Sequence, residues 1–292
     1  MSVYEYSYQY KRLPRDLDVE KQHVFLIGLD GWGAFSVQNE NFRMPTVEEL
    51  MARGCYTLQA LNIMPTVSLP NWSAMFMGAG PDITGYFTNE TTPKAPDVSI
   101  KDIYGLFPSI FVLLKEQRPQ CKVGFFYEWA PNGSLCPDNV INIKQHINNL
   151  SKDVSSVTNY IKTEKPHFCS IIIDQPDGVG HRDGYNTRGY YEELSRLDGL
   201  IAQIIQSIKD SGIWDNSIVI LSSDHGGVNK GHGRDTPLER KITFIIVGNN
   251  IKKGEKIYQD IMIYDIVPTI AYIFDLEIPF FWEGKVIRCF IK

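Results

Sequence analysis

The chain has 292 residues, 43% of them hydrophobic and 22% charged, with a formal net charge of −5. This composition suits a globular protein with a substantial core, and the acidic balance gives no reason to expect a surface for nucleic acid or for anionic membranes. No run approaches the roughly 18 apolar residues of a membrane span. The N-terminal segment contains no apolar run of the kind found in signal peptides. The five cysteines are scattered and show no Cys-x-x-Cys spacing. We therefore expect reduced thiols and a cytoplasmic protein.

The first predicted strand, His23–Leu29, is a continuous apolar run, which is typical of a parallel strand buried on both faces. Asp30 and Gly31 follow it. By itself an Asp-Gly pair favours a plain turn. The alternative is a carboxylate at the edge where parallel sheets bind ligands.

The segment 44–54 has Pro near its start and Gly at its end, which predicts a short capped helix. An extended segment follows over 56–63. Ser68 then lies in a turn entering a helix predicted over 73–78, where backbone N–H groups point at an anion. A serine at this place is also typical of a simple helix cap.

Residues 80–140 form the least regular part, rich in Pro, Asn, Thr and aromatic residues. Within it we expect an apolar helix near 110–114 and a strand over 122–127. The segment fits an inserted lid or substrate-recognition element, and it fits padding at the edge of the sheet equally well.

A helix is predicted over 152–162 and a buried strand over 167–173. Asp177 and His181 come after this strand in a Gly-rich turn, and their spacing allows both to reach one metal ion. A solvated loop is the alternative. A long amphipathic helix follows over 190–210.

The strand predicted over 217–221 is followed by Asp224 and His225, and His232 comes after a Gly-rich turn. Mixed carboxylate and imidazole ligands suit zinc, or manganese if carboxylates dominate. Two solvated histidines on a surface loop are the other interpretation. A further strand is predicted over 241–247, and a C-terminal helix over 263–274 with a break or late start at Pro268.

Strands separated by helices predict an α/β fold, a mainly parallel central sheet with helices on both faces. In such a sheet the strand ends meet at one edge, so three Asp and three His that are far apart in sequence are expected to come together. Six such groups suit two metal sites, and two metals about 4 Å apart suit an in-line displacement at phosphorus.

Several motifs extend this pattern. They are Leu29-Asp30-Gly31, Pro65-Thr66-Val67-Ser68-Leu69-Pro70-Asn71, Asp177-Gly178-Val179-Gly180-His181, Ser223-Asp224-His225-Gly226 and Asp265-Ile266-Val267-Pro268-Thr269-Ile270. In this order and spacing the sequence resembles the alkaline phosphatase superfamily, and within it the nucleotide pyrophosphatase/phosphodiesterase branch. The resemblance runs from about residue 23 to 287 and implies an alkaline-phosphatase-like fold of one domain over 1–292.

The resemblance also implies roles for single residues. Asp30, Asp224 and His225 would hold one zinc ion beside the nucleophile, and Asp177, His181 and His232 would hold the other. Ser68 falls at the nucleophile position, in contact with the first ion, and Asn71 falls at the position that binds a phosphoryl oxygen. Thr66, on the same turn, is the rival nucleophile.

Three departures from the nucleotide branch bear on the substrate. Ser68 stands where Thr is common, Leu69 where an aromatic residue offers a stacking surface, and Trp72 where His often follows Pro-Asn. His232 also follows His225 more closely than the last zinc ligand does in the extracellular enzymes. We expect phosphoester hydrolysis of a small soluble molecule, most of all a phosphodiester or pyrophosphate of nucleotide type, with no nucleic-acid polymer and no membrane as partner.

Other functions fit the residues less well. A phosphomonoesterase or phosphonate hydrolase would share the same metal core, and a non-catalytic metal-binding module is the alternative outside enzymes. A sulfatase would need Arg where Trp72 stands, and an acyl hydrolase would need a Gly-x-Ser-x-Gly elbow around Ser68. The chain has neither a Walker loop nor Gly-x-Gly-x-x-Gly, which disfavours kinases and NAD enzymes.

Overall fold

The computed structural model describes residues 21–92, 102, 105 and 107–289. An eight-stranded sheet forms its centre, with the strand order β4-β3-β5-β1-β6-β7-β2-β8. The strands are β1 (His23–Leu29), β2 (Cys55–Leu61), β3 (Val123–Tyr127), β4 (Ile143–His146), β5 (Phe168–Ile173), β6 (Ser217–Ser222), β7 (Lys241–Gly248) and β8 (Glu255–Lys256). Strand β7 runs antiparallel to its neighbours β6 and β2, and the other strand pairs are parallel. The predicted mainly parallel sheet is confirmed.

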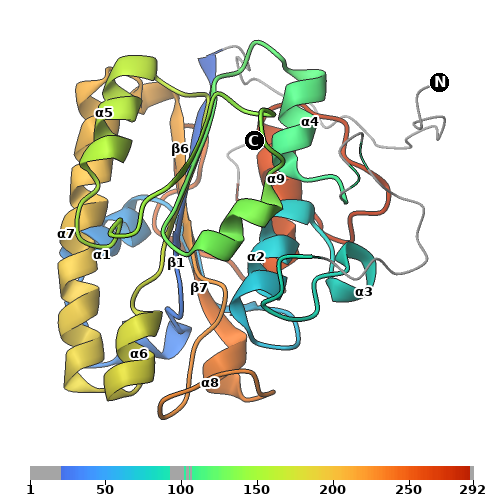
Figure 1. Ribbon diagram of the computed structural model, residues 1–292. Helices are drawn as coiled ribbons and strands as arrows, with labels where there is room; N and C mark the ends of the chain where they lie inside the picture. The colour runs from blue at the N-terminus through green and yellow to red at the C-terminus, as the bar shows by residue number, and fades with distance from the viewer. Residues whose placement is uncertain (1–20, 93–101, 103–104, 106, 290–292) are drawn as a thin grey trace.

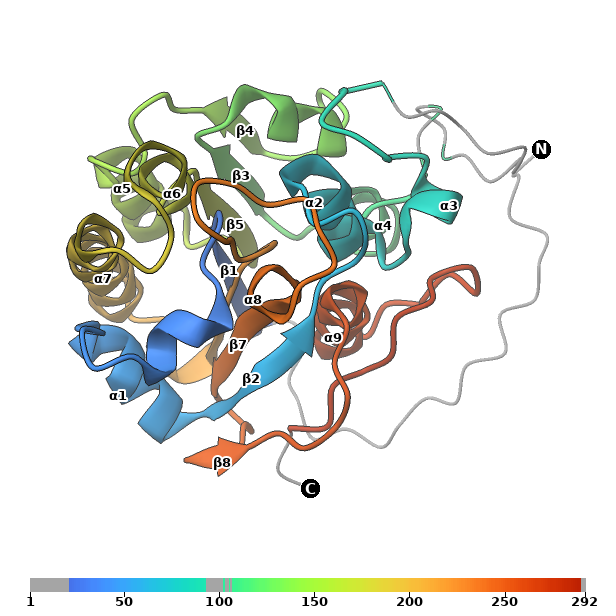
Figure 2. The ribbon, with the colours of Figure 1, turned by 90° about the horizontal axis from the view of Figure 1, so that it is seen from below.

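Helices cover both faces of this sheet (Figures 1 and 2). On one face lie α1 (Pro45–Arg53), α5 (Ser155–Glu164) and α7 (Arg188–Asp210), and on the other lie α2 (Ser68–Met77), α4 (Ile110–Gln117) and α9 (Ile266–Ile273). The short helices α6 (Asp177–Asp183) and α8 (Pro237–Arg240) lie at the bottom of Figure 1. That is the edge where β1 ends, so both helices lie at the edge where a site is expected.

The two faces of the sheet carry separate hydrophobic cores, and β1 contributes to both. Val24 and Leu26 belong to the core under α2, α4 and α9, whereas Phe25, Ile27 and Leu29 belong to the core under α1, α5 and α7. All five side chains are fully buried. Each contributes about 1.5–3 kcal/mol by leaving water, which explains why the strand is apolar at every position.

Two local features differ from the sequence predictions. Asp177 and His181 lie on α6 and not in a turn, so their spacing of four residues places them on one face of a helix. Helix α2 begins at Ser68, and Ser68 makes no capping hydrogen bond. The late start expected at Pro268 is confirmed, because α9 begins only after a 3₁₀ turn over Ile263–Asp265 and Pro268 is its third residue, where a missing N–H is harmless.

The irregular segment predicted for residues 80–140 has the helix expected near 110–114 and the strand expected over 122–127. It contains α3 (Pro81–Thr84), the buried helix α4 and β3, which is a strand of the central sheet. Helix α4 and strand β3 belong to the hydrophobic core, because their apolar side chains are buried. The positions 93–101, 103, 104 and 106 of the proposed lid lie outside the described residues.

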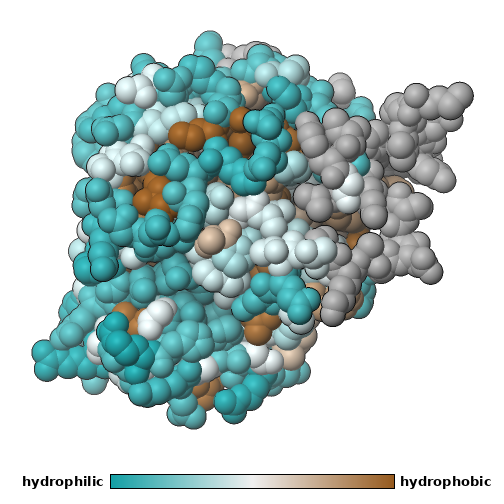
Figure 3. Space-filling view, viewed as in Figure 1, coloured by the Kyte–Doolittle hydropathy of each residue, from teal (hydrophilic) through white to brown (hydrophobic). Residues whose placement is uncertain are grey.

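The surface offers few large hydrophobic side chains. On the face shown in Figure 3 they appear as separate spots among hydrophilic residues. Within the described ranges the exposed ones are Met64, Phe87, Leu238, Tyr258 and Phe280. No helix in the described part of the chain is long and apolar enough to cross a membrane. The cysteines are free thiols.

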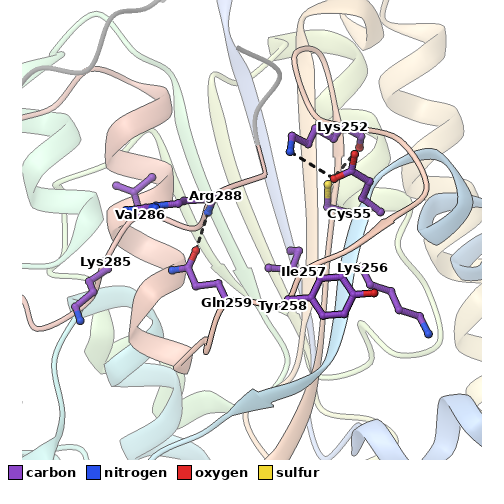
Figure 4. Close-up of a pocket in the computed structure, with 10 residues that line it drawn as sticks. Cys55, Lys252, Lys256, Ile257, Tyr258, Gln259, Lys285, Val286 and Arg288 are labelled. Atoms are coloured by element: carbon purple, nitrogen blue, oxygen red, sulfur yellow. Dashed lines mark hydrogen bonds and ion pairs between the residues drawn. The ribbon is translucent and has the colours of Figure 1, made fainter.

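One pocket of about 450 Å³ lies toward the opposite edge of the sheet, beside Cys55 at the start of β2 (Figure 4). Its basic residues are Lys252, Lys256, Lys285 and Arg288. The lysine side chains point in different directions, and Lys252 is paired with Glu255 at 3.4 Å. None of the predicted site residues lines this pocket. Its cations do not converge on one ligand position.

Candidate metal centre and nucleophile

The first group of candidate ligands lies where β1 and β6 end side by side. Asp30 follows β1, and Asp224 and His225 come after β6. His225 Nε2 lies 3.5 Å from Asp30 Oδ1 and 3.3 Å from Asp224 Oδ2. The three side chains are at most 1% exposed. Since β1 and β6 pair in parallel, the register of two strands places these groups together.

The second group joins α6 to the loop after β6. His181 Nε2 lies 3.2 Å from Asp177 Oδ2 and 3.2 Å from His232 Nε2, and His232 Nε2 lies 3.7 Å from Asp177 Oδ1. Asp177 also offers a ligand atom within 4.8 Å of those of Asp30 and His225. The two groups therefore meet at Asp177, and the six predicted ligands form one continuous cluster.

The three histidines share one arrangement, in which Nδ1 faces a backbone carbonyl. The pairs are His181 with Lys230 (2.9 Å), His225 with Gly226 (3.0 Å) and His232 with Thr66 (2.7 Å). A carbonyl oxygen can only accept, so Nδ1 carries the hydrogen and the neutral ring has a lone pair on Nε2. Each Nε2 faces the cluster, which is the orientation that a metal-binding histidine needs.

Burial acts against charge in this cluster. It raises the pKa of Asp224 to about 7 and, together with the charge of Asp224, raises the pKa of Asp30 well above its usual range. Burial also lowers the pKa of His225 and His232. Burial opposes ionisation of Asp177 as well, yet the hydrogen bond with His181 and the charge of His225 bring the pKa of Asp177 below its ordinary value. The hydrogen bond to Asp177 raises the pKa of His181 to about 9.

These residues fit bound divalent metal. Asp30 Oδ1 and Asp224 Oδ2 are buried and have no hydrogen-bond partner within the described residues. A buried carboxylate oxygen without a donor is costly, and a cation between the carboxylates would satisfy both. Three carboxylates and three imidazole Nε2 atoms are a donor set that zinc or manganese accepts.

Ser68 lies directly beside the cluster. Its Oγ is 3.2 Å from His225 Nε2, and it is the first residue of α2, whose N-terminus favours an anion. The rival Thr66 is fully buried, and its hydroxyl lies 3.1 Å from both Arg234 O and Glu239 Oε2. Between the two hydroxyls, the geometry therefore favours Ser68 as the nucleophile.

Asn71 bonds to the loop that precedes Ser68. Its Oδ1 accepts from Ile63 N at 2.8 Å, and its Nδ2 donates to Pro65 O at 3.0 Å and to Val67 O at 2.9 Å. The side chain is fully buried, and both amide hydrogens are used. These hydrogen bonds show that the amide shapes the loop that precedes Ser68, and the contact with a phosphoryl oxygen stays a prediction.

Asn89 takes a place that the sequence does not indicate. Its Oδ1 accepts from Leu69 N at 3.0 Å, which fixes the amide one residue from Ser68. Asn89 is exposed, and within the described residues its Nδ2 has no partner, so two donors are available beside the serine. No local pattern marks this asparagine, since it lies in the irregular segment and reaches α2 through the fold.

Two aromatic residues hold ligands in place, and no sequence motif marks that role either. The indole of Trp72 donates to Asp30 Oδ2 at 3.0 Å, and Gly28 leaves the space that this ring fills. Tyr185 donates a very short hydrogen bond to Asp177 Oδ1. Each residue orients one carboxylate of the cluster.

We expect opposite effects from the two asparagines. Asn71→Ala leaves buried backbone groups without partners at about 1–3 kcal/mol each, so it should lower Tm markedly. Asn89→Ala should lower kcat/KM about 10- to 100-fold with Tm and metal content unchanged, because an exposed donor to a phosphoryl anion is lost. Thermal melts and initial rates on both variants check this, and a stable Asn71→Ala with greatly reduced activity would support the predicted contact with a phosphoryl oxygen.

Solved structures show which class of fold carries this centre. An inactive variant of murine ectonucleotide pyrophosphatase/phosphodiesterase 5, in complex with AMP, superposes with a TM-score of 0.70 at 14% identity, over 88% of this chain and 96% of that chain. A 2-O GAG sulfatase superposes with a TM-score of 0.75 at 13% identity, over 91% and 73%. The fold is therefore the alkaline-phosphatase-like α/β fold.

The family follows from the sequence comparison. The family model described as type I phosphodiesterase / nucleotide pyrophosphatase matches residues 24–235, which include all six predicted ligands and Ser68. The chain belongs to this family, as its motifs indicate.

Individual relatives are distant. Human ectonucleotide pyrophosphatase/phosphodiesterase family member 1 is 25% identical over 222 residues, which are 71% of this chain and 24% of that protein. Human bis(5'-adenosyl)-triphosphatase ENPP4 is 22% identical over 214 residues, 70% of this chain and 47% of that protein. The chain spans from about a quarter to about half of the length of these relatives.

Proposed function

We propose that the protein is a two-metal phosphoester hydrolase that cleaves phosphodiester or pyrophosphate bonds of small nucleotide-like molecules. The observation that carries the proposal is the single cluster in which two ligand groups meet at Asp177, with Ser68 Oγ 3.2 Å from His225 Nε2. Family membership supports the reaction class. The name of ENPP4 as a bis(5'-adenosyl)-triphosphatase and the AMP bound to a protein of the same fold support the substrate class.

The roles of the residues follow from their positions. In the first step Ser68 Oγ forms a bond to phosphorus while the bond to the leaving oxygen breaks and the leaving group departs with its electron pair. The hydroxyl proton passes to solvent. Water then attacks the same phosphorus, and Ser68 is released with its proton restored. Asn89 donates to a non-bridging oxygen, and the N-terminus of α2 favours the charge that develops there.

Two divalent ions, zinc or manganese, would supply activation of the serine oxygen and stabilisation of the leaving oxygen. Asp30, Asp224 and His225 would hold the ion next to Ser68. Asp177, His181 and His232 would hold the other, with Asp177 near both. The backbone carbonyls on the three Nδ1 atoms, Trp72 and Tyr185 keep these ligands in place.

A substrate panel on zinc-loaded protein tests the proposal. We expect kcat/KM to be higher for bis-p-nitrophenyl phosphate and for a p-nitrophenyl nucleoside monophosphate than for p-nitrophenyl phosphate, because the diesters carry less charge into a site rich in carboxylates. A preference of tenfold or more for the monoester would make the protein a phosphomonoesterase. Turnover of none of the three by protein that binds metal would indicate a non-catalytic module.

A further inference from the structure

Arg234 places a cation at the rim of the site. It lies two residues after His232 and is exposed, and its guanidinium makes no hydrogen bond or ion pair with any described residue. The adjacent acid, Asp235, is engaged by Arg240 at 3.0 Å. Lys230, earlier in the same loop, donates its ammonium hydrogen to Arg182 O at 2.8 Å. With respect to the described part of the chain, the charge of Arg234 is thus available for a ligand.

The backbone of Arg234 is held firmly, in contrast to its side chain. Its N–H donates to Glu239 Oε2, and its carbonyl accepts from Thr66 Oγ1 at 3.1 Å. Glu239 and Thr66 are fully buried. A buried carboxylate that holds a backbone amide is a strong anchor, since the bond is charge-assisted. The fold therefore fixes the point from which the arginine side chain extends.

This anchored point lies next to the nucleophile loop. His232 Nδ1 bonds Thr66 O at 2.7 Å, Gly233 N bonds Thr66 Oγ1 at 2.8 Å, and a Cβ placed on Gly233 would lie 3.7 Å from Val67 Cγ1. Val67 is followed directly by Ser68. Residues 232 and 233 thus lie beside the loop that precedes the serine, and the exposed side chain of Arg234 extends from the next position of the chain.

We propose that Arg234 binds the second, non-reacting phosphoryl group of a pyrophosphate-linked substrate, which rests on the hydrolase function proposed above. The guanidinium is a rigid fork that binds phosphate oxygens in pairs and stays charged at every working pH. In the proposed function, Asn89 and the metal cluster already bind the phosphoryl group that Ser68 attacks. A second phosphoryl group projecting toward the rim is the anion that Arg234 can still reach. The preferred substrate is then a nucleoside polyphosphate or dinucleotide and not a simple diester.

The test compares one substrate that has a second phosphoryl group with one that lacks it. Arg234→Ala should lower kcat/KM for ATP, measured as AMP release, by about 10- to 100-fold, as expected for a lost charged hydrogen-bonding pair. The rate with bis-p-nitrophenyl phosphate should change less than about twofold, since it has a single phosphorus. Arg234→Lys should keep part of the activity on ATP because it keeps the charge. Arg188→Ala removes an exposed arginine paired with Glu192 on α7 and is the matched control, expected to change neither rate.

Two kinetic outcomes overturn the inference. If Arg234→Ala lowered kcat/KM equally for both substrates, Arg234 would bind the reacting phosphoryl group. If the variant kept the wild-type rate on ATP, Arg234 would not bind the substrate at all. In both cases the hydrolase function would survive, since wild-type turnover of bis-p-nitrophenyl phosphate tests that separately.

Calorimetric titration with α,β-methylene-ADP and with AMP tests the inference without turnover. Arg234→Ala should raise Kd for the methylene analogue about 10- to 100-fold and leave Kd for AMP unchanged. Equal Kd values for wild type and variant, or no binding of the analogue to wild type, would end the inference. The comparison holds even if the wild-type protein proves inactive on every substrate.

Discussion

Ser68→Ala is expected to lower kcat on bis-p-nitrophenyl phosphate by roughly three to six powers of ten, because loss of a covalent nucleophile removes the step on which turnover depends. The fold should not change, since the Ser68 hydroxyl has His225 Nε2 as its contact in the described structure and caps no helix. Bound metal should be largely retained, because one oxygen ligand out of the set is lost. Steady-state rates, elemental analysis and a thermal melt on the same preparation check these expectations together.

Ser73→Ala is the matched control. Ser73 lies on the same helix, is fully buried and donates its hydroxyl to Pro70 O at 2.7 Å, so its removal costs a local hydrogen bond without touching the cluster. We expect wild-type kcat within about twofold and a small fall in Tm. If Ser68→Ala kept wild-type rates while Thr66→Ala was inactive, the nucleophile would be Thr66 and the register of the motif would be off by two residues.

Removal of metal is expected to abolish activity and to lower stability. Zinc-loaded protein should hold close to two ions per chain, and a chelator should remove both. An ion present at 1,000 times its Kd stabilises the native state by about 4 kcal/mol, so Tm should fall by several degrees for each ion lost. The physical reason is that Asp30 Oδ1 and Asp224 Oδ2 are buried carboxylate oxygens without donors in the described structure.

Two variants of the cluster distinguish the two metal sites by their effects on zinc affinity. Asp177→Asn should weaken both sites, since Asp177 offers ligand atoms to each group, whereas Trp72→Phe should weaken the site at Asp30 by about 10- to 100-fold by removing the indole donor. Zinc titrations with a competing chelator measure both effects. Activity that persists in protein shown to contain no divalent metal would rule out the two-metal function.

The sequence by itself was sufficient for the fold class and for placing the candidate metal ligands at one edge of the sheet. Runs such as His23–Leu29 have no polar position because both faces of a central strand are buried, and that signal is local. A carboxylate or imidazole just after such a run must lie at the carboxyl edge of the sheet. The sequence therefore places Asp30, Asp224 and His225 at this edge, and the pairing of β1 with β6 in the fold brings them together.

Other features required the tertiary structure, because they depend on contacts between distant segments. Asn71 and Asn89 are the same type of residue, so the sequence does not distinguish their roles. Folding turns the amide of one inward onto the loop over residues 63–67 and brings the other across to Leu69. The sequence predicts a turn at Asp177 and His181 because glycine disfavours helices. A short helix forms there instead, with packing against α7 and a backbone hydrogen bond from Asp177 N to Asp30 O just after β1. Trp72, Tyr185 and Arg234 likewise have no local signal, since each acts on a group contributed by another part of the chain or by a ligand.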